Sequence, residues 1–309
     1  MTAQPIRIGT RDSKLAVWQA EYVQSSLKKA GYSSELVFIK TEGDQQQDLP
    51  IHQIGGQGVF TKALDDALLD NRIDLAVHSC KDLPTMMPEG ILLAAIPVRE
   101  DPRDVLVSNQ DISFLDDPHS EATIATSSNR RRGQWLSHYP NHKITEVRGN
   151  VQTRLRKLEE NGWQGIIFAA AGLKRLGLEH LISTSLDWML AAPAQGALAV
   201  ACRQGDADMR TVCADIHDER IAAGITAERT FLRILEGGCS APIGAHALIE
   251  DDTITLRGRL DALDGSKTIR VEAYGNLQTP ERVGEEAARQ ARDQGASAMV
   301  AMVRQQLFQ

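Results

Sequence analysis

One cysteine lies in the glycine-rich segment EGGCSAPIG, residues 236–244, and is the first candidate for chemistry. The two glycines before Cys239 have no side chains to cover its sulfur, and Pro242 restricts the backbone just beyond it. The preceding pattern predicts an amphipathic helix over residues 226–235, with Thr226 as its N-cap and the glycine pair at its end. We therefore expect Cys239 on an exposed turn, either reactive or modified. The alternative is a small buried cysteine.

Arginines gather in two segments that follow predicted strands. The first is TSSNRRR, residues 126–132, and the second is RGNVQTRLRK, residues 148–157. Hydroxyl groups, backbone amides and guanidinium groups at the start of a helix form an anion site, so these segments favour carboxylates or phosphates as ligands. The alternative is a solvated basic face.

A third segment whose residues could take part in chemistry is AVHSCKDLPT, residues 76–85, at the end of another predicted strand. Asp82 next to a lysine there suits proton handling or the binding of a cationic intermediate. His78 and Cys80 are two residues apart, which leaves a Cys–His nucleophile pair open, although His78 is more often structural. The glycine-rich IGGQGVFTK, residues 54–62, lacks the P-loop ending and is predicted to be a lid or hinge.

Composition excludes several classes of protein. The 309 residues carry a net charge of −7, which argues against general binding of nucleic acid. No signal-peptide core and no apolar run of the roughly 18 residues needed for a membrane span is present. The four cysteines show no metal-ligand spacing. We expect a cytoplasmic protein with free thiols and without a metal.

The elements that must position these residues alternate between strand and helix, which predicts mostly parallel sheets with helices on their faces. One helix is expected between the Ser13 cap and Gly31. Other helices are predicted over 60–70 and 150–161. Strands are predicted over 6–9, 36–39, 73–77, 123–126, 144–147, 166–170 and 197–201.

A proline and charge cluster at residues 96–108 predicts a crossing between two α/β domains, and the strand at 197–201 could return to the first of them. A third region opens near Asp215. It contains two predicted strands and a helix that begins at Thr279 and Pro280. Paired crossings suggest a hinged cleft, with ligands at the carboxyl ends of strands. The predicted strands of the third region cover 253–260 and 268–274.

Eight segments together resemble the porphobilinogen deaminase family, also called hydroxymethylbilane synthases. They occur in the family's order and spacing, and they cover nearly all of residues 6–244. The segments are RIGTRDSKLAVWQA, GGQGVFTK, HSCKDLP, REDPRDVLVS, TSSNRRR, RGNVQTRL, AAAGLKRLGL and TAERTFLRILEGGCSAPIG.

The resemblance implies a transferase of tetrapyrrole and haem biosynthesis. Such enzymes join four porphobilinogen molecules head to tail, release ammonia and free linear hydroxymethylbilane. They carry a covalent dipyrromethane cofactor, which the resemblance attaches through a thioether to Cys239. The catalytic carboxylate matches Asp82, which would stabilise the cationic azafulvene left by the loss of ammonia. The cysteine then acts as a permanent anchor and not as a nucleophile at each turnover.

The resemblance also implies two sets of binding residues, because each pyrrole carries two carboxylates that need cationic partners. The cofactor-binding set is Lys81, Asp82, Thr126, Ser127, Ser128, Arg130, Arg131, Arg148 and Gly149. The substrate-binding set is Arg11, Ser13, Gln19, Phe60, Arg148, Arg154 and Arg175.

In this interpretation the fold is α/β, with two periplasmic-binding-protein-like domains around a hinged cleft and a smaller C-terminal α+β domain. The partners are porphobilinogen and pyrrole-chain intermediates, without nucleic acid, membrane or metal, and we expect a monomer. The expected domains are 1–98 with 197–215, then 102–192, then 218–309.

The chain departs from the family pattern at a few positions. Gln53 and Gln57 replace common lysines, and Asn129 replaces an apolar residue. Cys80 often has a methionine counterpart, which argues against a catalytic role for it. Two other classes stay open. One is a non-catalytic two-domain anion receptor, and the other is a hydrolase or amidotransferase that uses Cys80 or Cys239.

Overall fold

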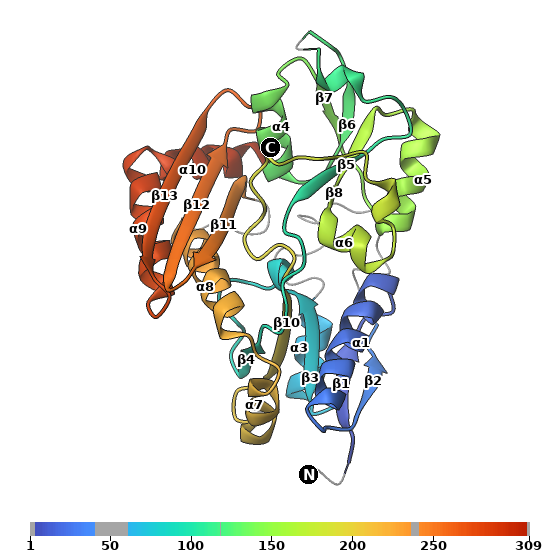
Figure 1. The fold of residues 1–309 in the computed structure, drawn as a ribbon, viewed down its shortest axis with the longest axis vertical. Coiled ribbons are helices and arrows are strands. Elements are labelled where there is room, and N and C mark those ends of the chain that lie inside the picture. The colour runs from blue at the N-terminus through green and yellow to red at the C-terminus, as the bar shows by residue number, and fades with distance from the viewer. Residues whose placement is uncertain (1–3, 41–60, 118, 236–240, 308–309) are drawn as a thin grey trace. The chain divides into compact units, whose positions relative to one another are not determined.

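The computed structural model describes residues 4–40, 61–117, 119–235 and 241–307 (Figure 1). The chain forms two compact units. The first consists of residues 1–100 and 196–222, and the second consists of residues 101–195 and 223–309. The predicted class, two α/β domains with a smaller α+β domain, is confirmed.

A five-stranded sheet with the order β2-β1-β3-β10-β4 forms the centre of the first unit. β1 pairs in parallel with β2 and β3, whereas β10 runs antiparallel to both of its neighbours. The chain therefore does return to the first sheet through β10, as predicted. The strands are β1 (Ile6–Thr10), β2 (Ser34–Phe38), β3 (Leu75–Ser79), β4 (Ile91–Ala95) and β10 (Leu198–Arg203).

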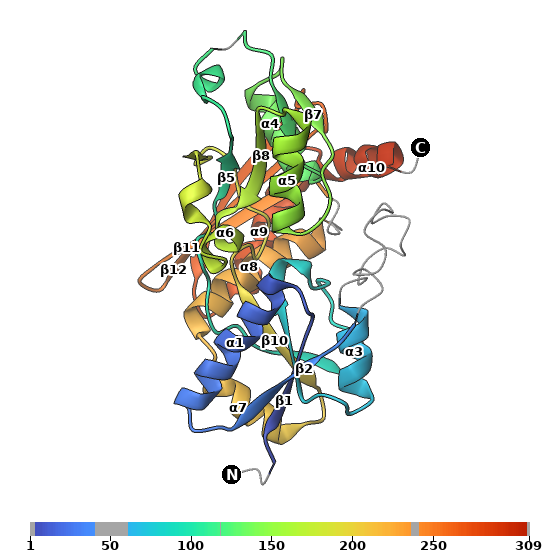
Figure 2. The same ribbon diagram turned by 90° about the vertical axis from the view of Figure 1, so that its right-hand side faces the viewer.

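Helices cover both faces of this sheet because its central strands bury side chains on both sides. α1 (Lys14–Lys29) and α7 (Ala207–Ala214) share one apolar cluster with the sheet, and α3 (Lys62–Leu69) belongs to a second cluster. Figure 2 shows α1 and α3 on opposite sides of the strands. Ser13 caps α1 by accepting a hydrogen bond from the backbone N–H of Ala16, so the predicted cap is confirmed.

A second five-stranded sheet, with the order β7-β6-β8-β5-β9, lies in the second unit. Its strands are parallel except around β5, which runs antiparallel to β8 and β9. α5 (Val151–Asn161) and α6 (Ala170–Arg175) share a cluster with one face, and α4 (Asn129–His138) packs on the other through Trp135. The strands are β5 (Asp104–Val107), β6 (Thr123–Ala125), β7 (Lys143–Thr145), β8 (Gly165–Ala169) and β9 (Thr184–Ser185).

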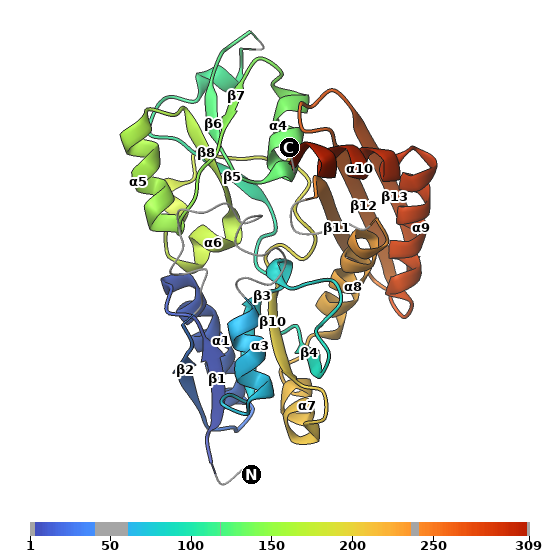
Figure 3. The same cartoon turned by 180° about the vertical axis from the view of Figure 1, so that it is seen from behind.

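The C-terminal part of the second unit is a three-stranded antiparallel sheet backed by helices. Figure 3 shows the helices on one face of this sheet. α4 packs closely on it, since a Cβ at Gly133 would lie 2.7 Å from the carbonyl oxygen of Ala262. The elements are β11 (Ile243–Glu250), β12 (Thr253–Asp261), β13 (Thr268–Asn276), α8 (Glu219–Ile234), α9 (Pro280–Asp293) and α10 (Ala296–Leu307).

Two helix predictions need correction. α8 begins at Glu219, so Thr226 lies inside the helix and is not its N-cap. Asp218 supplies the first-turn contact by accepting from the N–H of Ile221. Gly224 lies within this helix, where a Cβ would lie 3.3 Å from Ile249 on β11. α9 starts at Pro280 as predicted, but its N-cap Thr279 makes no side-chain capping bond.

Short connections complete the two α/β sheets. The 3-10 helices are η1 (Cys80–Asp82), η2 (Ser113–Leu115) and η3 (Glu179–Leu181). Of these, η1 directly continues β3 and carries Asp82. The predicted strand at 73–77 therefore lies two residues too early, and the end of the true strand is closer to the candidate catalytic segment.

Candidate functional site

A pocket forms in the first unit where two neighbouring parallel strands, β1 and β3, reach their carboxyl ends. Both strands are followed by a helical turn, so backbone amides and polar side chains collect at this edge of the sheet. The polar residues lining the pocket are Arg11, Ser13, Gln19, Thr61, His78, Ser79 and Asp82. Four of them, Arg11, Ser13, Gln19 and Asp82, were predicted from the sequence.

Asp82 lies at the last position of η1, three residues beyond the end of β3. The 3-10 turn ends at Leu83, which is 3% exposed and fixes the turn against the core. The side chain of Asp82 is exposed while it lines the pocket. This carboxylate is therefore accessible both to solvent and to the pocket.

The floor of the pocket is held by polar contacts from α1. Gln19 is buried, and its Nε2 donates a 2.8 Å hydrogen bond to Oγ of Ser79. Because Ser79 Oγ accepts this bond, its own hydroxyl hydrogen stays available as a donor. Gln19 was predicted to bind substrate, and its described contact is with Ser79.

His78, Ser79 and Thr61 also line the pocket, and none of them was assigned to the site from the sequence. The position of His78 and Ser79 directly before the Lys-Asp pair was the available signal. Cys80 is 0% exposed and does not line this pocket, which argues against the hypothesis of a Cys80 nucleophile.

In the second unit, the arginine run after β6 is mostly engaged in structural contacts. Arg130 Nη1 lies 2.6 Å from Asp104 Oδ2 and also donates to the carbonyl oxygen of Leu190. Arg131 donates to Asp104 Oδ1 through Nε and Nη2 and to the carbonyl of Ile167 through Nη1. Both arginines are less than 8% exposed.

Asp104 is fully buried and would be costly as an unpaired charge. Burial alone raises the pKa of its carboxyl, but the charges of Arg130 and Arg131 outweigh burial and hold that pKa well below its usual range. Gln195 adds a further hydrogen bond of 2.9 Å to Oδ1. The three charges thus form a buried network. The prediction that Arg130 and Arg131 bind cofactor stays a prediction.

Arg148 and Arg154 are more accessible candidates for carboxylate binding, since both are half-buried near the start of α5. Arg154 Nε donates to the carbonyl oxygen of Gly149, and Arg148 lies 3.6 Å from the exposed Glu146. Gly149 has φ of +110°, a conformation that L side chains rarely adopt. The loop that presents Arg148 therefore depends on glycine.

The hydroxyl groups after β6 organise the start of α4. Ser128 is the N-cap and accepts from the N–H of Arg131, while Thr126 is buried and accepts from the N–H of Ser128. Ser127 Oγ exchanges hydrogen bonds with the backbone of Val147. These hydroxyls shape the strand end, and their predicted contact with the cofactor is untested.

Arg175 and Lys81 were also predicted to bind ligand, the first to bind substrate and the second to bind cofactor. Arg175 is the last residue of α6 and is 7% exposed. Lys81 is half-buried within η1, one residue before Asp82. Cys239, Phe60, Gln53 and Gln57 lie outside the described residues.

The elements that flank the Cys239 segment are nevertheless joined. Glu228 on α8 is fully buried, and its two carboxylate oxygens accept 2.7 Å hydrogen bonds from the N–H groups of Ala194 and Ala247. One side chain therefore ties α8, which precedes the segment, to β11, which follows it, and to the backbone around Ala194.

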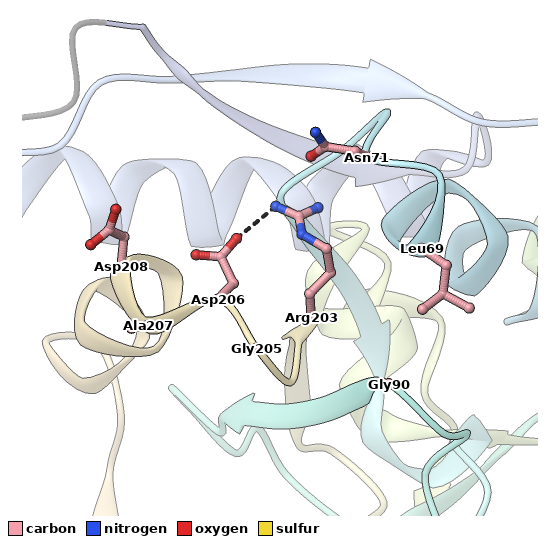
Figure 4. A pocket seen from close by; sticks show the side chains of 8 residues that line it. All are labelled: Leu69, Asn71, Gly90, Arg203, Gly205, Asp206, Ala207 and Asp208. Carbon is pink, nitrogen blue, oxygen red and sulfur yellow. Dashed lines mark hydrogen bonds and ion pairs between the residues drawn. The ribbon is translucent and has the colours of Figure 1, made fainter.

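Another pocket in the first unit does not suit the predicted chemistry. It lies near the start of α7, where Asp206 caps the helix (Figure 4). Arg203 already donates to Asp206 at 2.6 Å and to Asp74 at 3.2 Å. With its one arginine engaged by aspartates, this pocket lacks the cationic surplus that a polycarboxylate ligand needs.

Comparisons with known proteins identify the family of this chain. The family pattern described as "Porphobilinogen deaminase, dipyromethane cofactor binding domain" matches residues 6–211. The pattern described as "Porphobilinogen deaminase, C-terminal domain" matches residues 222–293. The chain belongs to the porphobilinogen deaminase family. It therefore works with a dipyrromethane cofactor.

Relatives from several bacteria match over almost the whole chain. Porphobilinogen deaminase of Syntrophotalea carbinolica is 45% identical over 97% of this chain and 96% of its own length. The Moorella thermoacetica enzyme is 44% identical over 97% of each chain. Among solved structures, an ancestral cationic amino acid solute binding protein has a TM-score of 0.44 and 14% identity, over 73% of this chain and 93% of its own. A likeness this distant supports no assignment.

Family membership establishes the activity predicted from the sequence. The protein is a transferase of tetrapyrrole biosynthesis that condenses four porphobilinogen molecules into linear hydroxymethylbilane with release of ammonia. In the part of the chain that the structure describes, no helix is long and apolar enough to cross a membrane.

Proposed function

We propose that the pocket at the carboxyl ends of β1 and β3 is where this condensation occurs, with Asp82 as the catalytic carboxylate. The observation that carries the proposal is the exposed Asp82 in a pocket that Arg11 also lines. Porphobilinogen carries an aminomethyl cation and two carboxylates. A pocket with one carboxylate and one guanidinium suits such a ligand, because each charge on the substrate has an opposite charge to meet.

Asp82 would act through its charge at each condensation. The C–N bond of the aminomethyl group breaks, ammonia leaves with the electron pair, and a cationic azafulvene remains. A pyrrole α-carbon then attacks the methylene carbon and loses its proton. The carboxylate of Asp82 accepts hydrogen bonds from pyrrole N–H groups and lowers the energy of the positive charge that develops on them.

The cofactor supplies a covalently held pyrrole primer, which makes each condensation effectively intramolecular. We infer that Cys239 holds it through a thioether. The donors in the second unit fit its carboxylates in chemical type, since Arg148 and Arg154 are half-buried guanidinium groups near a helix start. Arg11 would serve the incoming substrate, together with Ser13 and Gln19. Arg175 and Phe60 stay in the proposed substrate-binding set.

Intact-protein mass spectrometry tests the anchor. Active protein, denatured and weighed, should be heavier than its sequence by one dipyrromethane, and Cys239→Ser should lack the adduct. Cys213→Ser is a control for loss of a thiol, since Cys213 is fully buried in the first unit. Active protein with an unmodified mass would refute the role of Cys239.

We also infer a cytoplasmic monomer that acts on porphobilinogen and pyrrole-chain intermediates without a metal. The described residues contain no group of three or more metal-ligating acidic, His or Cys side chains. Gel filtration with light scattering would test the monomer, and activity that survives exhaustive chelation would test independence from metal.

A further inference from the structure

His78 is a buried group in the β1–β3 pocket that the reaction as described does not use. It lies at the next-to-last position of β3 and lines the pocket with Arg11 and Asp82. The side chain is 6% exposed, and its Nε2 has no hydrogen-bond partner among the residues that the structure describes. A buried nitrogen without a partner destabilises the ligand-free protein, which suggests that a ligand completes its bonding.

The charge around His78 indicates which chemical group of a ligand would bond to Nε2. Burial, with a smaller contribution from the charge of Arg11, lowers the pKa of His78 to about 4. The ring is therefore neutral at neutral pH, and each neutral imidazole has one N–H donor. Beside a guanidinium group the favoured ligand is an anion, so Nε2 would serve as the donor.

Ser79 offers a second donor at the same place. Its Oγ accepts the 2.8 Å hydrogen bond from Gln19, which directs its own hydrogen elsewhere. Arg11, Ser79 and His78 then present three donors in one pocket. Consecutive strand residues point to opposite faces, so His78 and Ser79 would donate to different oxygens, and the two carboxylates of a pyrrole have acceptors for all three donors.

We propose that His78 is a substrate-binding residue whose Nε2–H donates a hydrogen bond to a carboxylate of the incoming pyrrole, alongside Arg11 and Ser79. This inference rests on the proposed function of the pocket. The neutral histidine would orient the bound pyrrole, because its N–H has a fixed direction. The charge of a guanidinium group alone would tolerate several orientations of the pyrrole.

Two variants separate this role from a structural one. His78→Leu removes both ring nitrogens at similar volume, whereas the amide nitrogen of His78→Gln reaches close to the position of Nε2. We expect His78→Leu to raise KM for porphobilinogen at least about tenfold with kcat nearly unchanged, the size of one lost hydrogen bond to a charged group. His78→Gln should restore KM to within about threefold of the wild type.

Thermal unfolding supplies a readout that does not depend on activity. Replacing an unsatisfied polar group by an apolar one is neutral or stabilising, so the Tm of His78→Leu should equal or exceed that of the wild type. A lower Tm in both variants with equal losses of kcat would show a structural histidine and overturn the proposal. An unchanged KM in His78→Leu would overturn it as well.

A competitive inhibitor tests the ligand group itself. A pyrrole that keeps the acetate and propionate side chains but lacks the aminomethyl group should bind His78→Leu more weakly by the same factor as the substrate. Its neutral diester should bind the wild type and His78→Leu equally. Equal binding of the dicarboxylate to both proteins would overturn the proposal. Wild-type protein without the dipyrromethane mass would instead refute the proposed function.

Discussion

In the first unit, an exposed carboxylate, Asp82, lies where β1 and β3 reach their carboxyl ends. His78 lies at the same edge, and its Nε2 has no hydrogen-bond partner among the described residues. In the second unit the corresponding edge buries Asp104 between Arg130 and Arg131. Each sheet has one antiparallel strand starting at this edge. β10 starts with Leu198 opposite Ser79, whereas β5 starts with Asp104 opposite Ala169.

This difference separates two uses of charge in similar sheets. A buried carboxylate that already has two guanidinium partners is electrostatically satisfied, and it stabilises the positions of the elements around it. An exposed carboxylate in a pocket with an unsatisfied imidazole has capacity left for a ligand. We therefore propose the first edge for the chemistry. At the second edge the buried charges pair with one another, and cofactor binding by Arg130 and Arg131 stays a prediction.

The largest effect should come from Asp82→Asn. Because the carboxylate would stabilise a developing cation, we expect kcat to fall by at least about 10²–10³-fold. The free energy of unfolding should change by less than about 0.5 kcal/mol, because the side chain is exposed. Steady-state assays and urea unfolding measure the two quantities. Glu89→Gln, another exposed acid of the first unit, is the control, and comparable loss in both variants would contradict the assignment.

The reverse pattern is expected for Asp104→Asn. Removing the shared carboxylate leaves two buried guanidinium groups without their counter-charge, which should lower the free energy of unfolding by about 3–5 kcal/mol. Urea unfolding followed by tryptophan fluorescence checks this value. The control is Asp187→Asn, which removes a 72% exposed partner of Arg103 and should cost less than about 1 kcal/mol. Equal effects would remove the contrast between the two edges.

Lysine substitutions sharpen the comparison within the second unit. Arg131→Lys keeps the charge but cannot make all three hydrogen bonds that the guanidinium group makes with Asp104 and Ile167, so we expect a loss of about 2 kcal/mol in stability. Arg154→Lys should leave stability within about 1 kcal/mol and raise KM. If Arg131→Lys instead loses the dipyrromethane mass at full stability, Arg131 is a cofactor ligand as the sequence suggested.

A smaller, pH-dependent effect is expected at His142 in the second unit. Its Nδ1 accepts a 3.2 Å hydrogen bond from Trp135 Nε1, and burial lowers the pKa of its ring. A lowered pKa means that the folded state favours the neutral ring. The neutral ring of His142 therefore contributes to the free energy of unfolding. That contribution is complete above the unfolded pKa of about 6.5, and it is lost as pH falls toward the lower folded pKa.

We accordingly expect Tm to fall below pH about 6.5, with an accompanying change in the fluorescence of Trp135. His142→Asn keeps a possible acceptor near Nδ1 and does not titrate, so it should weaken this dependence. A Tm profile with the same slope in His142→Asn and wild type would show that other groups control acid stability.

Much of the fold was predictable because its signals are local. The helix after Ser13 begins where a hydroxyl oxygen can cap it, and the helix after Asn150 begins where a side-chain amide oxygen can do so. β11, α7 and α10 were not predicted, although Asp206 caps α7 by accepting from the N–H of Met209. The predicted start of α8 was wrong because Thr226 was taken as the N-cap, whereas Asp218 accepts the first-turn hydrogen bond from Ile221.

The candidate site, like the fold, has one part that the sequence predicted and another that only the tertiary structure shows. Asp82, Arg11 and the cysteine segment carry recognisable residue types at strand or helix ends. The sequence by itself therefore determined the family and the reaction, and it proposed the central residues. Only tertiary structure decided which charges are available. Asp104 on β5 is 26 residues from Arg130 and 27 residues from Arg131 on α4, so no local pattern links them, yet it pairs with both. Burial and pairing depend on contacts between distant segments, and those contacts determine whether an arginine or a histidine meets a ligand or the protein itself.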